Sequence, residues 1–301
     1  MKKISVILST YNSEKVIAET LKCIFNQEGL NDLFTMEVII ADDCSTDHTR
    51  AICEKFPVVF LTNDINSGGP NKGRNKGLNY ASGDFICLCD HDDHWSPNKL
   101  KVQLAVSEFA PIISGGYKII DLISGKEIIR TQQIASPYLY KENQTFLKLL
   151  SRSSAGQIVY LSGLMFAAEL KTILFEEEFG FLDYNWFVSL FENQKSIQVP
   201  DILFTRFVAD NNLSLNEKYR LKDHEVALKL LNQYKEIYPT ESALGISKFN
   251  GTLARYYYLS GDMKKARKLF FTAGFSLKHF FFYFTSFFGH RLVIRFFHFF
   301  G

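Results

Sequence analysis

The chain has 301 residues, 47% hydrophobic and 22% charged, which is ordinary for a folded globular protein and leaves room for one α/β unit with an appendage. Its five cysteines are odd in number and form no CxxC pair, which argues against a disulfide framework and a zinc site and suggests a reducing compartment. The net charge of +2 hides an asymmetry: seven Lys and Arg residues and no acid follow Asp262, so the first 262 residues carry −5.

The N-terminus begins like a signal peptide, but its apolar run stops at Leu8 and no cleavage site follows. We therefore expect a first strand of a cytoplasmic protein. Four apolar runs predict strands buried on both faces: ISVIL (4–8), EVIIA (37–41), VVFL (58–61) and FICLC (85–89). Helical patterns lie between them at residues 13–26, 46–55 and 70–81. This alternation predicts a parallel sheet with right-handed crossovers.

Polar segments follow all four predicted strands, and ligands of such sheets bind outside the carboxyl ends of the strands. The acidic residues there are Asp42, Asp43, Asp90, Asp92 and Asp93, and their polar neighbours are Thr10, Tyr11 and Asn12. Carboxylates this close repel one another unless a cation lies among them. Solvated loops are the alternative, but they would scatter their acids over both edges of the sheet. The pattern favours a divalent-metal site.

The third predicted helix begins with Gly69 as its cap and Pro70 at its first position. It lacks the glycine order of a phosphate-binding loop or a dinucleotide fold. Gly73 and Gly77, four residues apart, let this helix lie close to the sheet. Arg74 is a candidate for binding a diphosphate, whereas the other basic residues of the helix suit a solvated face.

After residue 100 the pattern loosens. Residues 118–130 alternate around a Ser-Gly turn and predict a hairpin, and residues 216–272 are helical in pattern. Asp183 opens a helix with an apolar face, either as a functional carboxylate or as an N-terminal cap. Trp95 and Trp186 are equally compatible with bordering a sugar or acceptor cleft and with core packing.

The last 27 residues contain eleven phenylalanines and no acid. The apolar stretch between Lys278 and Arg291 is shorter than the roughly 20 residues that span a bilayer. Arg291, Arg295 and His298 share one helix face, which suits the interface of an anionic membrane. The alternative is a terminal helix packed on the protein or on a dimer partner. We do not expect a nucleic-acid partner, because so much phenylalanine with so few cations tracks phosphates poorly.

The segments SVILSTYN, VIIADDCSTDHT, GRNKGLNYASGDFICLCDHDD and FLDYNW resemble, in order and spacing, the motifs of inverting, nucleotide-sugar-dependent glycosyltransferases with the GT-A fold. The resemblance covers roughly residues 3–210. It implies an α/β fold with a Rossmann-like, mainly parallel sheet. We expect a catalytic domain at 1–215, a helical extension at 216–272 and a Phe-rich, basic, membrane-associating tail at 273–301.

The resemblance also implies roles for the site residues. Asp42 and Asp43 would hold the nucleobase and ribose, and Thr10, Tyr11 and Asn12 would line that pocket. Asp92 would hold a Mg²⁺ or Mn²⁺ that bridges the diphosphate, because hard oxygen ligands suit a hard cation. Asp90 would contact the ribose side and is a second candidate for the metal, and Arg74 would contact the nucleotide. Asp183 would be the catalytic base, although Leu182 stands where the family usually has Glu.

These inferences predict a metal-dependent transferase that moves a sugar from a nucleotide sugar, UDP-sugar favoured, to a hydroxyl of a saccharide or lipid-linked acceptor. Its place would be the inner face of a bacterial membrane, in cell-surface polysaccharide synthesis. One alternative is a sugar-nucleotide pyrophosphorylase, which would carry a Gly-rich basic loop after the first strand. Another is an inactive membrane-associated binding or assembly protein, which the joint presence of Asp42, Asp90, Asp92 and Asp183 opposes.

Overall fold

The computed structural model describes residues 1–208, 217–274 and 277–290. It contains two compact units. The first comprises residues 1–146 and 155–212, and the second comprises residues 147–154 and 213–301. The division therefore does not follow chain order alone, because residues 147–154 group with the C-terminal helices.

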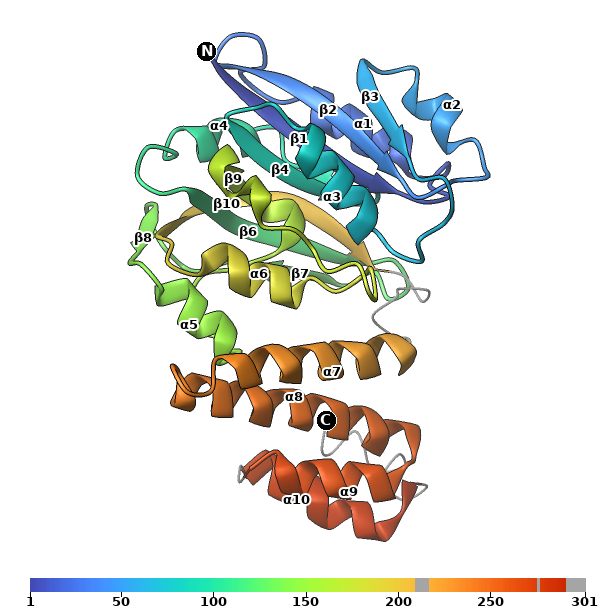
Figure 1. The fold of residues 1–301 in the computed structure, drawn as a ribbon, viewed down its shortest axis with the longest axis vertical. Helices are drawn as coiled ribbons and strands as arrows, with labels where there is room; N and C mark the ends of the chain where they lie inside the picture. Colours follow the sequence, from blue (N-terminus) through green and yellow to red (C-terminus); the bar gives the residue numbers. More distant parts are fainter. Residues whose placement is uncertain (209–216, 275–276, 291–301) are drawn as a thin grey trace. The chain divides into compact units, whose positions relative to one another are not determined.

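Four parallel strands form one half of the sheet of the first unit: β1 (Lys2–Thr10), β2 (Phe34–Asp42), β3 (Val58–Thr62) and β4 (Phe85–Asp90). Their order is β3-β2-β1-β4, and every neighbouring pair is parallel. Figure 1 shows these strands side by side in blue and teal. The predicted parallel sheet is confirmed.

Helices cover both faces of these strands because successive side chains of a strand point to opposite faces. Val6 and its even-numbered neighbours on β1 share a core cluster with Leu21 of α1 (Ile17–Phe25). Ile7 faces α3 (Asn71–Tyr80) instead, where a Cβ on Gly77 would lie 2.5 Å from Cγ2 of Ile7. Glycine thus permits the close approach of helix and sheet. The second predicted helix is realised as a short α2 (Thr49–Cys53).

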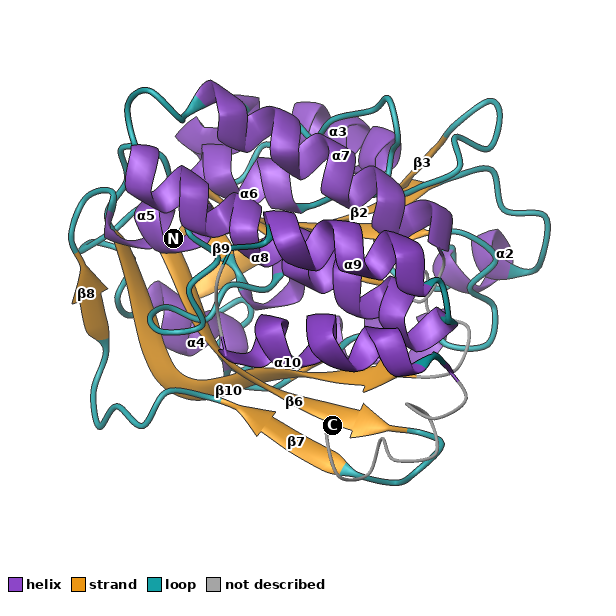
Figure 2. Ribbon diagram, turned by 90° about the horizontal axis from the view of Figure 1, so that it is seen from below, coloured by secondary structure: helices purple, strands orange, loops and turns teal. Residues whose placement is uncertain are grey.

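The other half of the sheet contains β9 (Met165–Ala167), β6 (Ile112–Asp121), β10 (Ser196–Val208) and β5 (His94–Trp95). β6 and β10 are parallel, whereas β9 pairs antiparallel with both β4 and β6. The predicted hairpin is confirmed, because β7 (Glu127–Arg130) pairs antiparallel with β6. Figure 2 shows β6, β7 and β10 side by side. β8 (Tyr138–Tyr140) pairs with β10.

The remaining helices of this part of the chain are α4 (Lys99–Leu104), α5 (Gln144–Leu150), η1 (Leu161–Gly163), η2 (Ala168–Thr172) and α6 (Tyr184–Phe191). Both tryptophans are core residues, since Trp95 is 3% and Trp186 2% exposed. Trp186 stacks on Phe175 and donates its indole N–H to the carbonyl of Ile173. Of the two interpretations of these tryptophans, core packing is therefore the one realised.

One ion pair fixes the start of the sheet. The carboxylate of Glu37 accepts hydrogen bonds from Ser5 Oγ and from the backbone N–H of Ser82, and Lys3 Nζ lies 2.7 Å from its Oε2. Burial opposes the charged form, but these hydrogen bonds outweigh it and lower the pKa of Glu37 to about 2. Glu37 therefore stabilises the fold only while it is ionised.

The second unit consists of α7 (Glu217–Gln233), α8 (Pro239–Ser260), α9 (Met263–Thr272), α10 (Leu277–Thr285) and η4 (Ser286–Phe288). Gly261, with a φ of 96°, ends α8, and the side chain of Asp262 caps α9 by accepting from the N–H of Lys265. Phe282 of α10 is 2% exposed and packs against Tyr258 and Phe270.

The predicted tail thus has a described part, α10 and η4, that contributes to the core of the second unit. Arg291, Arg295 and His298, on which the membrane prediction drew, lie outside the described residues. Within the described ranges, no helix combines the length and apolar character that crossing a bilayer requires. The five cysteines are free, and three of them are buried.

Candidate active site

The polar segments after the strands lie at one edge of the sheet, as the sequence predicts. In the strand register Thr10 is paired with Asp42, and Asp42 with Thr62. On the other side of β1, Ser9 is paired with Asp90. Parallel pairing of neighbouring strands therefore brings residues from four distant stretches of chain to the same edge.

Asp42 is 3% exposed, and its carboxylate is surrounded by hydrogen-bond donors. Oδ1 accepts from the hydroxyls of Thr10 and Ser45, and Oδ2 accepts from the Ser45 N–H and from Thr62 Oγ1. These bonds tie together the ends of β1, β2 and β3. Asp42 therefore organises this edge, and contact with a nucleotide stays a prediction.

Asp43 is 4% exposed, and its carboxylate anchors residues 63–67, which follow β3. Its Oδ1 accepts from Asn63 Nδ2 and from the hydroxyl and N–H of Ser67, which hold residues 63–67 against the end of β2. Tyr11, in contrast, is 47% exposed, and Asn12 has a φ of 46°. Of the predicted pocket residues, Tyr11 is thus presented to solvent while the two aspartates are held within the protein.

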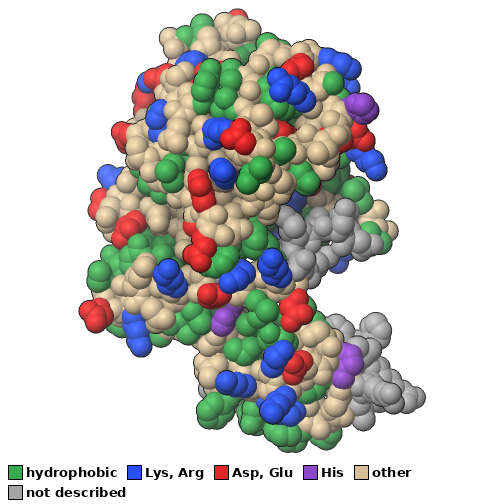
Figure 3. Space-filling view, turned by 45° about the vertical axis from the view of Figure 1, so that its right-hand side comes forward, with side chains coloured by type: hydrophobic (Ala, Val, Ile, Leu, Met, Phe, Trp, Pro, Cys, Tyr) green, Lys and Arg blue, Asp and Glu red, His purple; other side chains and the backbone are tan. Residues whose placement is uncertain are grey.

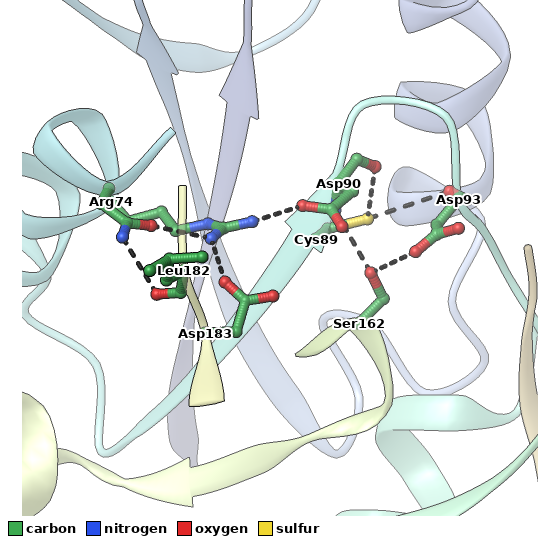
Figure 4. A network of polar contacts seen from close by, with 8 residues as sticks. Arg74, Cys89, Asp90, Asp93, Ser162, Leu182 and Asp183 are labelled. Atoms are coloured by element: carbon green, nitrogen blue, oxygen red, sulfur yellow. Dashed lines mark hydrogen bonds and ion pairs between the residues drawn. The ribbon is translucent and has the colours of Figure 1, made fainter. Parts of the chain in front are cut away.

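Arg74 connects Asp90, at the end of β4, with Asp183, just before α6. Its guanidinium lies between two carboxylates: Nη2 donates to Oδ1 of Asp90 and Nη1 to Oδ1 of Asp183, both at 2.8 Å (Figure 4). The arginine is 4% exposed, whereas the side chains of Asp90 and Asp183 are 27% and 34% exposed. Burial opposes the charge, but Asp183 and Asp90 outweigh it and raise the pKa of Arg74.

This arrangement gives Arg74 partners that the sequence did not suggest. Asp183 does not cap α6 through its side chain, since no such hydrogen bond forms at the helix start. Its carboxylate is instead aimed at Arg74, beside the aspartate at the end of β4. The predicted base and the predicted donor-side acid therefore share one cation, and binding of a diphosphate by Arg74 stays a prediction.

The loop that carries Asp183 is fastened to the polar face of α3. Asn71 donates through its backbone N–H to the carbonyl of Gly180 and through Nδ2 to that of Leu182. Asn75 exchanges two hydrogen bonds with the backbone of Phe175. A Cβ on Gly69 would lie 2.2 Å from the carbonyl oxygen of Gly180, so only glycine allows this approach. The start of α3 thus fixes the position of the predicted base.

Asp92 and Asp93, the remaining acids of the site, both have raised pKa values. Asp93 is 1% exposed, and Ser162 Oγ donates to its Oδ2 at 2.5 Å. Burial, together with repulsion from Asp90, raises the pKa of Asp93 well above its usual range. Burial also raises the pKa of Asp92, and Asp90 adds to the effect while His91 opposes it. Negative charge is therefore unfavourable at these two carboxylates.

These residues can supply only part of a metal site. Among the described residues, no group of three or more His, Cys, Asp and Glu side chains is placed to hold a metal ion. Mg²⁺, however, is usually held by one or two carboxylates together with substrate phosphates. Asp92, a half-buried carboxylate with a raised pKa, fits such a role, whereas Oδ1 of Asp90 is already engaged by Arg74.

Two residues of the site were not predicted. Arg206 of β10 attracts both Asp92 and Asp93 electrostatically, and its guanidinium carbon lies 5.3 Å from the ring centroid of Tyr160. Tyr160 is largely buried near Asp93 and Asp90, and burial raises the pKa of its hydroxyl. Neither belongs to a recognisable motif. A basic residue within a strand pattern was the one signal that could have identified Arg206.

Comparison with known proteins gives matches in sequence and in fold. The family model described as Glycosyl transferase family 2 matches residues 5–165. An Escherichia coli protein named UDP-Glc:alpha-D-GlcNAc-diphosphoundecaprenol beta-1,3-glucosyltransferase is 28% identical over 270 residues, which cover 85% of this chain and 90% of the relative.

A second relative is the poly(ribitol-phosphate) beta-N-acetylglucosaminyltransferase TarS of Staphylococcus aureus, 43% identical over 105 residues. That match covers 34% of this chain and only 18% of the relative. The crystal structure of TarS in complex with UDP-GlcNAc superposes with a TM-score of 0.65 at 20% identity, covering 90% of this chain and 82% of that one. This likeness shows the shared fold.

Proposed function

The chain belongs to glycosyl transferase family 2 and is a glycosyltransferase with the GT-A fold, and on that basis we propose that it transfers a sugar from a UDP-sugar to a hydroxyl of a lipid-linked saccharide. Membership of this family sets aside the pyrophosphorylase alternative. The observation that carries the proposal is the position of Asp183, which Arg74 holds beside the acid at the end of β4. UDP and a lipid-diphosphate acceptor are favoured because the name of the Escherichia coli relative specifies both.

Asp183 is suited to the role of general base. One of its oxygens is oriented by Arg74, and the side chain is 34% exposed, so an acceptor hydroxyl can reach the carboxylate. The acceptor oxygen attacks the anomeric carbon from the face opposite the leaving diphosphate, and its proton passes to Asp183. The anomeric configuration is inverted, and the nucleoside diphosphate leaves with the bonding electrons.

On the donor side, the residues fastened by Asp42 and Asp43 would form the floor of the nucleoside pocket, and exposed Tyr11 would lie against the base. Asp92, with a contribution from Asp90, would hold a Mg²⁺ or Mn²⁺. When bound, such an ion neutralises the charge of the departing diphosphate. Arg206 attracts the same acids and would add positive charge beside the phosphates.

A lipid-linked acceptor implies that the protein works at a membrane surface. We place it at the inner face of a bacterial membrane, in the assembly of a cell-surface polysaccharide. The excess of basic residues after Asp262 is consistent with attachment to anionic lipid.

The first experiment follows release of nucleoside diphosphate from a panel of UDP-, GDP- and dTDP-sugars, with Mn²⁺ or with EDTA. We expect slow hydrolysis of one UDP-sugar that EDTA and Asp92→Asn abolish. Asp183→Asn should retain UDP binding and lose transfer. Lack of hydrolysis together with no nucleotide-induced thermal shift would contradict the proposal and favour the inactive assembly protein.

A further inference from the structure

The second unit presents aromatic side chains to solvent on three neighbouring elements, α9, α10 and η4. On α9, Phe271 is 80% exposed. After α10, Phe287 and Phe288 of η4 are 62% and 55% exposed, and Phe284 on the last turn of α10 is 57% exposed. Burial of such rings is normally favourable by about 1.5–3 kcal/mol each, so a cluster left in water marks a surface that meets another apolar phase.

Two of these rings, Phe271 and Phe287, line a groove, which we name the α9–η4 groove. It has a volume of about 560 Å³ and is lined by Arg267, Lys268, Phe271, Thr272, Tyr283 and Phe287. At the lower end of Figure 3, hydrophobic and basic side chains lie next to each other on the surface of this unit. The groove thus combines two cations with three aromatic rings.

The structure holds one of these cations in place. The guanidinium of Arg267 donates to the carbonyl oxygen of Ser286, and its central carbon lies 4.6 Å from the ring centroid of Phe287. Lys268, one residue on, is exposed. No acidic residue follows Asp262 in the sequence, so no Asp or Glu side chain of residues 263–301 competes for these cations.

We propose that the α9–η4 groove is the site at which this protein binds an anionic membrane. A lipid phosphate lies between Arg267 and Lys268, while Phe271 and Phe287 enter the headgroup region. Cations beside aromatic rings are the composition that interfacial binding requires. A second copy of the chain fits less well, because it would bring the same cations against each other. This surface differs from the terminal stretch with Arg291 and Arg295, and it does not depend on the transfer chemistry.

The test is flotation of the full-length protein with vesicles of phosphatidylcholine alone or of equal parts phosphatidylcholine and phosphatidylglycerol. We expect binding only to the anionic vesicles, weakened at high salt. Lys268→Glu should weaken partitioning about thirtyfold, because it reverses a charge at the surface. Phe271→Ser should weaken it about tenfold through lost apolar burial.

Matched controls lie elsewhere on the same unit. Lys235→Glu makes the same charge change at an exposed lysine outside the groove, and Ile237→Ser removes an apolar side chain that is 68% exposed. Both should bind vesicles like the unaltered protein. Because Lys268 and Phe271 are exposed, their variants should keep the melting temperature, so lost binding will not reflect unfolding.

Equal binding to both vesicle types, or equal losses in the groove and control variants, would overturn the proposal. Self-association in sedimentation that Lys268→Glu or Phe271→Ser abolishes, without vesicle binding, would assign the groove to a second copy. Hydrolysis of the UDP-sugar is measured separately in solution. A negative vesicle result therefore does not contradict the transferase proposal. A negative hydrolysis result likewise does not contradict membrane binding by the groove.

Discussion

Replacing Arg74 by methionine would test whether this residue positions the predicted base. The change removes both hydrogen bonds of the guanidinium, to Asp90 and to Asp183, while methionine keeps much of the buried volume. Asp183 would lose the contact that orients its carboxylate, although Asn71 would still hold the neighbouring backbone through the carbonyl of Leu182.

The size of the effect follows from the geometry. A hydrogen bond to a charged group contributes about 1.5–3 kcal/mol. Asp183 is about one-third exposed, so water replaces part of the lost interaction and the lower half of that range applies. A loss of about 2 kcal/mol at the transition state corresponds to a thirtyfold lower kcat. Binding of UDP should change less than kcat, because Asp183 serves the acceptor and the backbone N–H of Asp90, on the donor side, still donates to Ser162 Oγ.

The assay compares kcat for sugar transfer with the Kd of UDP measured by calorimetry. Lys72→Met is the matched control: it removes one positive charge from an exposed position of the same helix and should leave both quantities unchanged. If Arg74 instead binds the diphosphate directly, Arg74→Met should weaken UDP binding by about 10- to 100-fold. That result, or a kcat equal to that of Lys72→Met, would refute the positioning role.

Three further predictions concern stability and loop geometry. Glu37→Gln should lower the free energy of unfolding at pH 7 by about 3 kcal/mol. The pKa of Glu37 is about 2 in the folded protein against an ordinary 4.5, so folding favours the ionised form, which glutamine cannot adopt. The difference should shrink as the pH falls from 4.5 to 2 in urea titrations, and a pH-independent difference would contradict it. Gly69→Ala should destabilise the fold by roughly 1–3 kcal/mol and lower kcat, because its Cβ would clash with the carbonyl oxygen of Gly180. An unchanged melting temperature and kcat would show that the loop moves to accommodate the Cβ. Burial lowers the pKa of Lys99 below 10.5, so charging this lysine at lower pH destabilises the folded state. Urea unfolding should therefore show a greater stability of Lys99→Met relative to the unaltered protein at pH 7 than at pH 10. The opposite trend would exclude a buried charge.

The sequence was sufficient for the four parallel strands and for the edge at which their polar tips meet, but not for the mixed half of the sheet, in which β9 is antiparallel to β4 and β6. Strands buried on both faces appear as continuous apolar runs, and their alternation with helices allows essentially one handedness and one edge for the polar tips. That local information placed Asp42, Asp90 and Asp92 at the same edge. Gly73 and Gly77 likewise marked α3 as a helix that lies close to the sheet, because only missing side chains permit that approach.

Tertiary structure decided what the site residues contact. Arg74 and Asp183 are 109 positions apart, and no periodicity or spacing records that they meet at 2.8 Å. The hydrogen bonds that occupy Asp42 and Asp43 come from loops whose paths depend on the whole sheet. The sequence by itself therefore determined which strand-end residues reach this edge of the sheet, because strand patterns are local, but it indicated neither Arg206 nor Tyr160. Only the folded chain determined which of them pair, because pairing depends on distances between segments that the sequence does not contain.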